Sequence, residues 1–419
     1  MAYTADLHLH SSFAYACSKN LTLENISAQA KLKGIDLLTT ADFTHPKWRE
    51  DLRAKLTPRG DGLFSFNEVN FLLGAEVSCV YPQDGRSRRV HLSVFVPDFA
   101  TVDRLVQRLA VAGNKLESDG RPTLKMSARD FAEMALDINP ATVIIPAHVW
   151  TPWYGVFGTK SGFDTLAECF LDLTPQIHAI ETGLSSDPAM IWPISELAQK
   201  TIVSFSDAHS PAKLGRELTV FPGEPSYQGF ADALANQSVE YTLEFYSEEG
   251  KYHYSGHRKC GVRQTPEETQ QLGNRCPVCG RPLTLGVLHR IASAYQGPQS
   301  HQNNPPGFPS GNPAFRKNDQ DGFVRSQQGR PPFIRLVPLV ELIAGVLGRG
   351  PSTRGVSAEY DRMTQELGSE FQILVSAGQD ALVKVGGEEL AQSILKARVG
   401  DVEVEPGYDG VYGKVRVVH

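Results

Sequence analysis

The stretch Asp6-Leu7-His8-Leu9-His10-Ser11, near the start of the chain, carries two histidines at alternate positions. Residues two apart on an extended strand point to the same face, so both imidazoles can serve one metal centre. The stretch Ser206-Asp207-Ala208-His209-Ser210 repeats this spacing after another apolar run. Because the carboxyl ends of the strands of one sheet or barrel meet at one face, the pattern predicts an α/β fold with a metal site there.

Other residues of the metal-binding types lie in or after the apolar runs between these two stretches. The candidate ligands are His8, His10, Glu76, His91, His148, Asp207 and His209. Imidazole and carboxylate donors suit Zn, Mn, Mg or Fe, and a bridging carboxylate can hold two or three ions close together. Taken singly, His91 could be a core histidine and Glu76 half of a buried ion pair. The full set is hard to explain by packing, because buried polar groups are costly unless they are paired.

Short apolar runs alternate with amphipathic helical patterns throughout the first half of the chain. The expected strands are 5–10, 35–42, 71–81, 89–97, 142–149, 177–183 and 201–207. The expected helices are one between Thr22 and Gly34, 103–111, one that follows Ser127, 164–173 and 189–199. This alternation is typical of parallel α/β proteins, and the polar strand ends favour a TIM-like barrel.

Bulk composition indicates a cytoplasmic protein of two or three domains. The chain has 419 residues, 41% of them hydrophobic, and no run of 18 apolar residues that would span a membrane. The first residues show no secretion signal, and six cysteines in so long a chain do not form a disulfide scaffold. The net charge of −6 argues against a generic nucleic-acid binder, although the segment 248–354 is basic and could contact phosphates.

Changes in composition divide the chain into four parts. A metal-binding domain is expected over 1–235, and a short cysteine-bearing module over 245–295. Residues 296–333 are rich in Pro, Gly, Gln, Asn and Ser and predict a flexible loop, because they offer little apolar surface to bury. A small, mostly helical C-terminal domain is expected over 334–419.

The cysteine-bearing module has the spacing of a structural zinc site. His257 and Cys260 are separated by two residues, as are Cys276 and Cys279, which is a four-ligand template with one Cys replaced by His. His253 and His289 remain alternatives for the histidine ligand. The alternative for the cysteines is that they are free thiols. A closed site would stabilise a module too small to fold alone.

Aromatic and basic residues near the expected strand ends are candidates for DNA contacts. Trp150 and Trp153 follow His148 and could stack on a base or wedge a duplex, or could instead pack against the rim of the barrel. Lys19, Lys213 and Arg216 could hold phosphates, or could be ordinary surface residues.

The His-x-His start, the Gly-x-Glu strand, the Pro-x-His strand and the Ser-Asp-Ala-His strand resemble the PHP (polymerase and histidinol phosphatase) superfamily. The resemblance implies a distorted (β/α)7 barrel that hydrolyses phosphoesters with two or three metals. The usual Thr-Asp-His is replaced here by Asp42-Phe43-Thr44-His45. Asp42 could be a ligand or could orient one, and the catalytic role of His45 stays open against a core or capping role.

Longer stretches resemble the endonuclease Q family of PHP-domain DNA repair endonucleases over nearly the whole chain. They are Asp42–Trp48, Ile145–Trp153, Glu181–Pro188, Ser206–Glu217, the zinc segment and the ending Pro406–Gly413. The resemblance implies cleavage by metal-activated hydroxide on the 5′ side of a deaminated base (uracil, hypoxanthine or xanthine) or an abasic site. It implies double-stranded DNA as partner, clamped by the zinc module and the C-terminal domain, and a location at the nucleoid.

Within that interpretation Asp207 is the residue expected to handle the proton, and damaged bases are expected to be flipped. A sliding clamp is considered as a partner, although no convincing clamp-binding motif is present. Two other functions stay open: a PHP phosphoesterase acting on a small phosphorylated metabolite, and a zinc-containing DNA-binding protein with an inactive barrel. The appended basic segments argue against the first, and the complete ligand set argues against the second.

Overall fold

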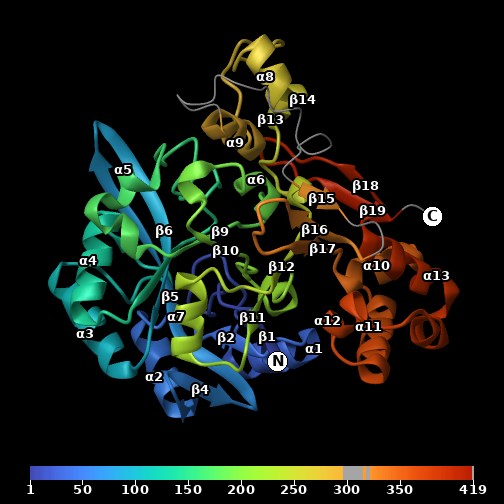
Figure 1. The fold of residues 1–419 in the computed structure, drawn as a ribbon, viewed down its shortest axis with the longest axis horizontal. Helices are drawn as coiled ribbons and strands as arrows, with labels where there is room; N and C mark the ends of the chain where they lie inside the picture. Colours follow the sequence, from blue (N-terminus) through green and yellow to red (C-terminus); the bar gives the residue numbers. More distant parts are fainter. Residues whose placement is uncertain (296–314, 318–320, 418–419) are drawn as a thin grey trace.

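The computed structural model describes residues 1–295, 315–317 and 321–417 (Figure 1). The α-helices are α1 (Leu23–Lys33), α2 (Pro46–Lys55), α3 (Phe99–Val111), α4 (Ala128–Ile138), α5 (Leu166–Phe170), α6 (Pro188–Ile191), α7 (Tyr227–Ala235), α8 (Pro266–Leu272), α9 (Val287–Tyr295), α10 (Leu339–Val346), α11 (Arg354–Leu367), α12 (Glu370–Val375) and α13 (Gln379–Val399). Short 3-10 helices are η1 (Leu171–Gln176), η2 (Ser195–Leu197), η3 (Pro211–Lys213), η4 (Ser247–Glu249) and η5 (Arg258–Cys260). Within these described residues no helix is long and apolar enough to cross a membrane.

The strands belong mostly to one large mixed sheet. They are β1 (Ala2–Asp6), β2 (Leu37–Thr39), β3 (Thr57–Gly60), β4 (Leu63–Phe66), β5 (Val69–Gln83), β6 (Arg86–Val96), β7 (Thr123–Leu124), β8 (Val143–Pro146), β9 (Ala179–Glu181), β10 (Thr201–Val203), β11 (Leu218–Pro222), β12 (Tyr241–Glu244), β13 (Ser255–His257), β14 (Val262–Gln264), β15 (Phe315–Lys317), β16 (Phe323–Ser326), β17 (Phe333–Arg335), β18 (Val402–Glu405) and β19 (Lys414–Val417). Helices and strands therefore alternate in the first half, as the sequence predicts, and the fold is mixed α/β.

The sheet departs from the purely parallel arrangement expected from the sequence. β1 pairs with β2 and β2 with β5 in parallel, but β1/β11, β5/β6 and β6/β8 are antiparallel. β9 and β10 form a separate parallel pair. The long antiparallel β5/β6 ribbon arises because β6 follows β5 after the tight turn Asp84-Gly85, where both residues have positive φ.

Backbone hydrogen bonds nevertheless connect the strand ends where the site lies. Val149 N, after β8, donates to Glu181 O of β9 at 3.0 Å, and Thr182 N donates to Val203 O of β10 at 3.0 Å. His10 N donates to Ala208 O at 3.2 Å and so returns to the segment after β1. These bonds bring the ends of β1, β8, β9 and β10 together around one centre.

Helices cover the outer side of the β5/β6 ribbon, where α3 and α4 lie (Figure 1). α3 buries Val102, Leu105 and Leu109, a helical spacing that directs one apolar stripe inward. α1 begins at its Thr22 cap and ends at Gly34, whose φ of 78° is the left-handed conformation typical of a helix C-cap. Two expected helices are shorter than predicted: α5 ends at Phe170, and α6 stops before Pro193, since proline interrupts helical hydrogen bonding.

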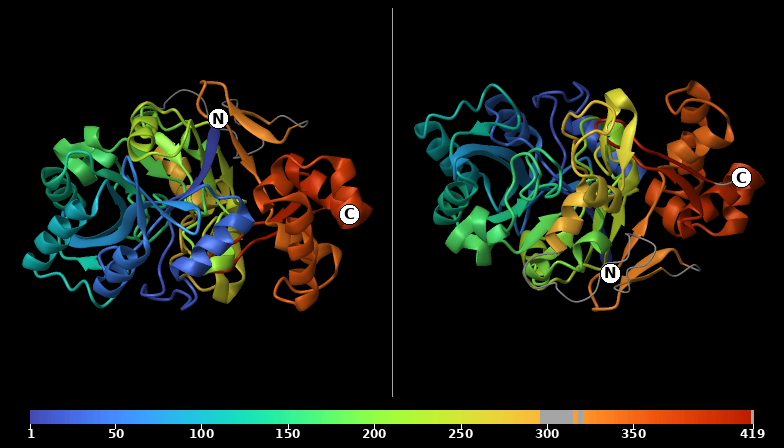
Figure 2. Two further views of the ribbon diagram at one scale, coloured as in Figure 1. Left: turned by 90° about the horizontal axis from the view of Figure 1, so that it is seen from below. Right: turned by 90° about the horizontal axis from the view of Figure 1, so that it is seen from above.

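The zinc module leaves the sheet after β12 and returns through β17. β17 pairs with β12 in parallel, with Thr242 opposite Phe333. β16 pairs with β17 and β15 with β16, both antiparallel. The module itself lies at one end of the molecule, with the β13/β14 hairpin and helices α8 and α9 (Figures 1 and 2).

The expectation of a flexible loop over 296–333 needs correction where the structure describes it. Residues 296–314 and 318–320 lie outside the described residues. Strands β15 and β16 occupy 315–317 and 323–326, and Val324 is buried. The composition gives no sign of these strands because each depends on pairing with a neighbour: β15 pairs with β16, and β16 pairs with β17.

The C-terminal part is mostly helical, with α10 to α13 followed by the β18/β19 hairpin (Figure 2). α12 packs against the end of α1, where a Cβ on Gly34 would lie 2.2 Å from Ser369 Oγ. Lys33 of α1 forms a buried ion pair with Glu370 of α12. The C-terminal helices are therefore fixed directly to the N-terminal domain.

Candidate metal centre

Glu76, in the middle of β5, is the carboxylate around which the predicted ligands gather. Its Oε1 lies 2.7 Å from His91 Nδ1 and 3.2 Å from His148 Nε2. Its Oε2 lies 3.5 Å from His8 Nε2 and 3.4 Å from His10 Nε2. Each carboxylate oxygen of Glu76 therefore faces a different pair of imidazoles, as a bridging ligand would.

Asp207 and His209 extend this arrangement into a third group. Asp207 Oδ1 lies 3.2 Å from His10 Nε2, 3.6 Å from His8 Nε2 and 3.5 Å from His209 Nδ1. The donor atoms lie within 4.8 Å of one another in each of the groups His8/His10/Glu76, His10/Asp207/His209 and Glu76/His91/His148. Because the groups share His10 and Glu76, the structure brings all the predicted ligands into one continuous cluster.

The backbone at the cluster is held in unusual conformations. Asp42, His148 and Asp207 have φ of 41°, 31° and 46°, in the left-handed region that residues other than glycine rarely adopt. His8 and His10 lie beyond the end of β1 at Asp6, and not within the strand as expected. Strained backbone at several ligands is characteristic of a functional site that the surrounding fold over-determines.

A second layer of carboxylates orients the histidines. Glu181, at the end of β9, lies 2.9 Å and 2.8 Å from His8 Nδ1 through its two oxygens and is fully buried. Asp42 accepts from Ser11 N and Ser11 Oγ, both at 2.6 Å, and lies 3.4 Å from His10 Nδ1. Metal-binding histidines are commonly held by such carboxylates. Asp42 is thus placed to orient His10, and Glu181 is a site residue that the sequence interpretation missed.

The cluster carries an excess of negative charge. Burial alone would lower the pKa of His8, but Glu181, Glu76 and Asp207 together raise it well above its ordinary value. At His91 burial prevails and lowers the pKa to about 4, so that this imidazole is neutral and able to act as a ligand. Arg121, a second residue that the sequence interpretation missed, lies 3.0 Å from Glu76 Oε2 through its Nη1. Carboxylates outnumber this single arginine, which favours bound cations.

Unsatisfied atoms at the centre fit metal ions. His8 Nε2, His10 Nε2 and Asp207 Oδ1 are buried, and they find no hydrogen-bond partner among the described residues. A buried polar atom without a partner is costly, and these three face one another. Their separations of 3.2 to 3.6 Å resemble the roughly 3.3 Å that tetrahedral ligands with bonds of about 2.0 Å would show.

Two residues predicted for catalysis or DNA contact lie away from the cluster's interior. His45 precedes α2, stacks on Phe13 at 4.4 Å and lies 3.2 Å from Glu117 O through its Nε2. Trp150 is only 1% exposed and stacks on Phe157 at 4.7 Å. The prediction that Trp150 contacts DNA is therefore wrong, because a core residue cannot offer its ring to a base.

The other predicted DNA-contact residues remain accessible. Trp153 is 37% exposed and meets Tyr252 edge to face. Lys19 is exposed and donates to Ser12 O at 2.8 Å. Lys213 lies in η3, shortly after His209 in the sequence, and is also exposed. They stay candidates for DNA contact.

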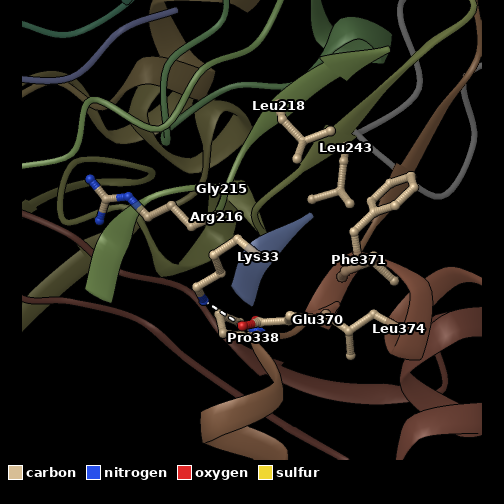
Figure 3. A pocket seen from close by; sticks show the side chains of 10 residues that line it. Lys33, Gly215, Arg216, Leu218, Leu243, Pro338, Glu370, Phe371 and Leu374 are labelled. Carbon is tan, nitrogen blue, oxygen red and sulfur yellow. Dashed lines mark hydrogen bonds and ion pairs between the residues drawn. The ribbon is translucent and has the colours of Figure 1, made fainter. Parts of the chain in front are cut away.

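Arg216 supports the loop that carries Asp207. Its Nε donates to Ser206 O at 2.8 Å and its Nη2 to Asp207 O at 3.3 Å. Arg216 also lines a pocket between the N-terminal domain and the C-terminal helices, opposite the Lys33–Glu370 pair (Figure 3). The metal centre and the C-terminal helices are thus linked through neighbouring residues.

The four residues predicted for structural zinc also converge. The donor atoms of His257, Cys260, Cys276 and Cys279 lie within 4.8 Å of one another, and Cys279 Sγ lies 3.4 Å from His257 Nδ1. His253, one alternative for the fourth ligand, is buried elsewhere against Tyr254. Three thiols and one imidazole in such a group form the donor set of a tetrahedral zinc site.

Comparisons with known proteins place the chain beside two solved structures. One is the lesion-specific endonuclease PfuEndoQ from Pyrococcus furiosus, 30% identical, with 100% of this chain and 96% of that chain covered and a TM-score of 0.83. The other is an endonuclease Q in complex with a 27-mer duplex that has an abasic lesion at the active site; it is 30% identical, with 100% and 97% covered and a TM-score of 0.82.

Comparisons by sequence give relatives without a described activity. The uncharacterized protein YqxK of Bacillus subtilis is 27% identical, with 98% of both chains covered. The uncharacterized protein MJ0043 of Methanocaldococcus jannaschii is 28% identical over 274 residues, which are 64% of this chain but 31% of that protein. Residues 338–401 match the family model described as the MJ0043 C-terminal domain. The chain therefore spans about a third of MJ0043 but nearly all of YqxK.

Proposed function

The chain belongs to the endonuclease Q family, and we propose that it is a metal-dependent DNA repair endonuclease. It would cut the phosphodiester on the 5′ side of a deaminated base or of an abasic site. The observation that carries this proposal is the continuous cluster of imidazole and carboxylate donors around Glu76, with its unsatisfied buried atoms. That cluster would form one end of a PHP-type barrel holding two or three divalent ions.

Ions bound to His8, His10, Glu76, His91, His148, Asp207 and His209 would lower the pKa of a bound water and offset charge on the phosphate. The chain itself supplies orientation and proton handling. Glu181 and Asp42 hold the rings of His8 and His10. The side chain of Asp207 is 23% exposed, whereas that of Glu76 is 1% exposed. Asp207 is therefore the carboxylate of the cluster that can meet solvent and substrate and accept the proton of the attacking water.

The cysteine-bearing module and the residues near the metal centre would bind the DNA. The zinc cluster of His257, Cys260, Cys276 and Cys279 would hold the module in shape, and basic residues on it, such as Arg258 and Lys259, would face phosphates. Trp153 would stack near the lesion, and flipping is least costly at a mispaired or missing base. No finding supports a sliding clamp, so the proposal does not include one.

A cleavage assay tests the proposal. Purified protein with Mn²⁺ or Mg²⁺ is incubated with duplexes that carry one deoxyuridine, one deoxyinosine or one abasic site, and with an undamaged duplex of the same sequence. The expected product is a single cut 5′ to the lesion that disappears when EDTA is added. Asp172→Asn changes an exposed residue of η1 and serves as the control variant. It should cut the lesion-bearing duplexes as the parent protein does.

Three results would contradict the proposal. Equal cleavage of damaged and undamaged duplexes would remove lesion specificity. Hydrolysis of a small phosphate monoester with no DNA cleavage would instead favour a phosphoesterase for small metabolites. DNA binding that is lost with the zinc module, in a protein without barrel metals, would favour a binding protein.

A further inference from the structure

Arg121 reaches the metal centre from a segment, 117–122, that is tied down at almost every residue. Gly120 N donates to Phe13 O at 3.1 Å, and Gly120 O accepts from Thr44 Oγ1 at 3.2 Å. Asp119 Oδ1 accepts from Tyr15 N at 2.9 Å and from Arg121 N at 3.1 Å. A segment held in this way delivers its side chain with little freedom.

Gly120 shows how closely this segment passes the centre. A Cβ at this position would lie 2.4 Å from Asp42 Oδ2 and 2.9 Å from Ala14 N, so only glycine fits. His45, which takes no place in the metal cluster, lies 3.2 Å from Glu117 O through its Nε2 and so supports the start of the same segment. The altered Asp42–His45 motif therefore positions Arg121 from two sides.

The guanidinium of Arg121 uses only part of its donor capacity within the protein. Its Nη1 lies 3.0 Å from Glu76 Oε2, and its side chain is 20% exposed. Within the described residues its Nε and Nη2 take part in no hydrogen bond. An arginine presents five N–H donors in a rigid planar fork that matches two oxygens of a phosphate. The contact of Nη1 with Glu76 places this guanidinium beside the donors of the cluster.

Neutralising Glu76 is a poor explanation for an arginine here, because bound ions would supply that charge. A guanidinium held beside the ions by a rigid segment is instead suited to an anion that bridges them. We propose that Arg121 donates from its free nitrogens to a non-bridging oxygen of the scissile phosphate while Nη1 stays on Glu76. This inference rests on the proposed phosphodiester hydrolysis, and it adds a catalytic residue to the metal ligands. Arg121 and the bound ions would then orient the phosphate together.

The test compares Arg121→Lys, which keeps a charge near Glu76 but loses the fork, with Arg121→Gln. Arg129→Gln, an arginine on α4 that pairs with Asp172 and Glu133, is the matched control. Hydrolysis of bis(p-nitrophenyl) phosphate with Mn²⁺ gives kcat for a phosphodiester without regard to lesions. Elemental analysis gives the metal content, and the rise in Tm with inorganic phosphate gives anion binding without turnover.

With the metal content unchanged, kcat is expected to fall about 100-fold or more in Arg121→Lys, the usual cost of losing one transition-state donor. The rise in Tm with phosphate should disappear in Arg121→Gln, and Arg129→Gln should behave as the parent protein. Activity within about threefold of the parent in Arg121→Lys, with full metal, would overturn the inference. So would a loss of metal that accounts for the loss of activity, because Arg121 would then act only through the ligands. If the parent protein hydrolyses the diester but leaves damaged DNA uncut, the proposed function fails and this inference does not.

Discussion

The metal centre and the zinc cluster are two collections of similar donors that are built in opposite ways. The candidate metal centre gathers side chains from His8 to His209, on several strands and on the segments that follow them, and most of these side chains are buried. The zinc cluster takes its donors from 257–279 alone, and Cys279 is exposed. Long-range hydrogen bonds join the segments that carry the first set of donors, whereas the second set lies on one short segment that would depend on a bound ion.

The core beneath each centre explains the difference. Under the metal centre lie the β5/β6 ribbon and helices α3 and α4, with their apolar residues in one large cluster. The cysteine-bearing module has few buried apolar side chains of its own: Leu283 is buried, and Val287 and Ile291 of α9 pack into that same large cluster. Small domains with so little core usually need a metal to fold. The comparison therefore predicts that ions at the first centre would act in catalysis and an ion at the second would act in folding, and four changes test this prediction.

The largest effect is expected for Cys276→Ala. Removing one ligand should abolish zinc binding, whose apparent contribution is about 10 kcal/mol in small zinc-dependent folds, so that the module unfolds while the N-terminal domain stays folded. The measurements are zinc content and hydrogen-exchange protection of 255–272. Cys169→Ala, in the core of the N-terminal domain, is the control and should keep its zinc. A module still protected without zinc would break the comparison.

Asp207→Asn should give the next largest effect. It should lower activity and leave thermal stability nearly unchanged. The amide keeps the size of the side chain but removes the charge that faces His8, His10 and His209, so the rate should fall by about 10³ or more. Cleavage of a lesion-bearing duplex under single-turnover conditions measures it. Tm should change little, because other hydrogen bonds hold the loop. A large fall in Tm would show that the metal centre, like the zinc cluster, is needed for folding.

Glu181→Gln tests whether the second layer of carboxylates matters at the metal centre. It weakens the hold on His8 Nδ1, and metal affinity or activity should fall by about 10- to 100-fold. Competition with a chelator measures the affinity of the site around Glu76, and the zinc content of the cysteine-bearing module should not change. Glu168→Gln, in the exposed face of α5, is the control. Unchanged affinity in Glu181→Gln would leave the buried carboxylate without a role in metal binding.

The smallest effect concerns a buried acid close to the centre. Burial raises the pKa of Glu244 to about 8, although hydrogen bonds from Ser204 and Thr242 oppose the shift. Between its ordinary pKa and this value the folded state keeps a proton that the unfolded state has lost. Stability should therefore fall as pH rises from 5 to 8, by at most about 1.4 kcal/mol per pH unit. Glu244→Gln should flatten that slope in thermal unfolding, whereas Glu240→Gln, at an exposed site, should keep it.

If stability depends on pH with the same slope in Glu244→Gln and in the parent protein, the pKa of Glu244 is the same in the folded and unfolded states, and the prediction fails. The pH range matters for the comparison, because the zinc ligands also bind protons. The transition of the N-terminal domain should therefore be followed separately from that of the zinc module, for example through its buried tryptophans Trp48 and Trp150.

The ligand set could be predicted from sequence because its members share one local signal, a metal-type residue after an apolar run. His8 and His10 converge although they lie beyond β1, since an extended backbone keeps alternate side chains on one face. Glu181, like Glu76, is a carboxylate that follows an apolar run, and it could have been found by the same signal. Arg121 could not, because it lies in a loop and meets Glu76 only through the tertiary fold.

The errors have a common physical cause. Trp150 follows a ligand strand, and the sequence leaves both DNA contact and packing open for it; it is buried, in a segment 149–157 that folds back on itself, where Phe157 N donates to Val149 O at 2.8 Å. Composition does not predict the strands β15 and β16, because they form by pairing, β15 with β16 and β16 with β17. Local sequence patterns predict the strand ends well, but they do not predict which residues a distant segment of the chain buries.

The parallel pairing of β12 with β17 has a practical consequence for protein engineering. β12 ends at Glu244, but β15 and β16 join the same sheet before the chain reaches β17, the neighbour of β12. The module that follows β12 is also bound to the C-terminal segment, where Tyr254 N donates to Gly407 O at 3.0 Å. A graft of this module from a relative would therefore need to include β15 to β17 and the residues around Gly407.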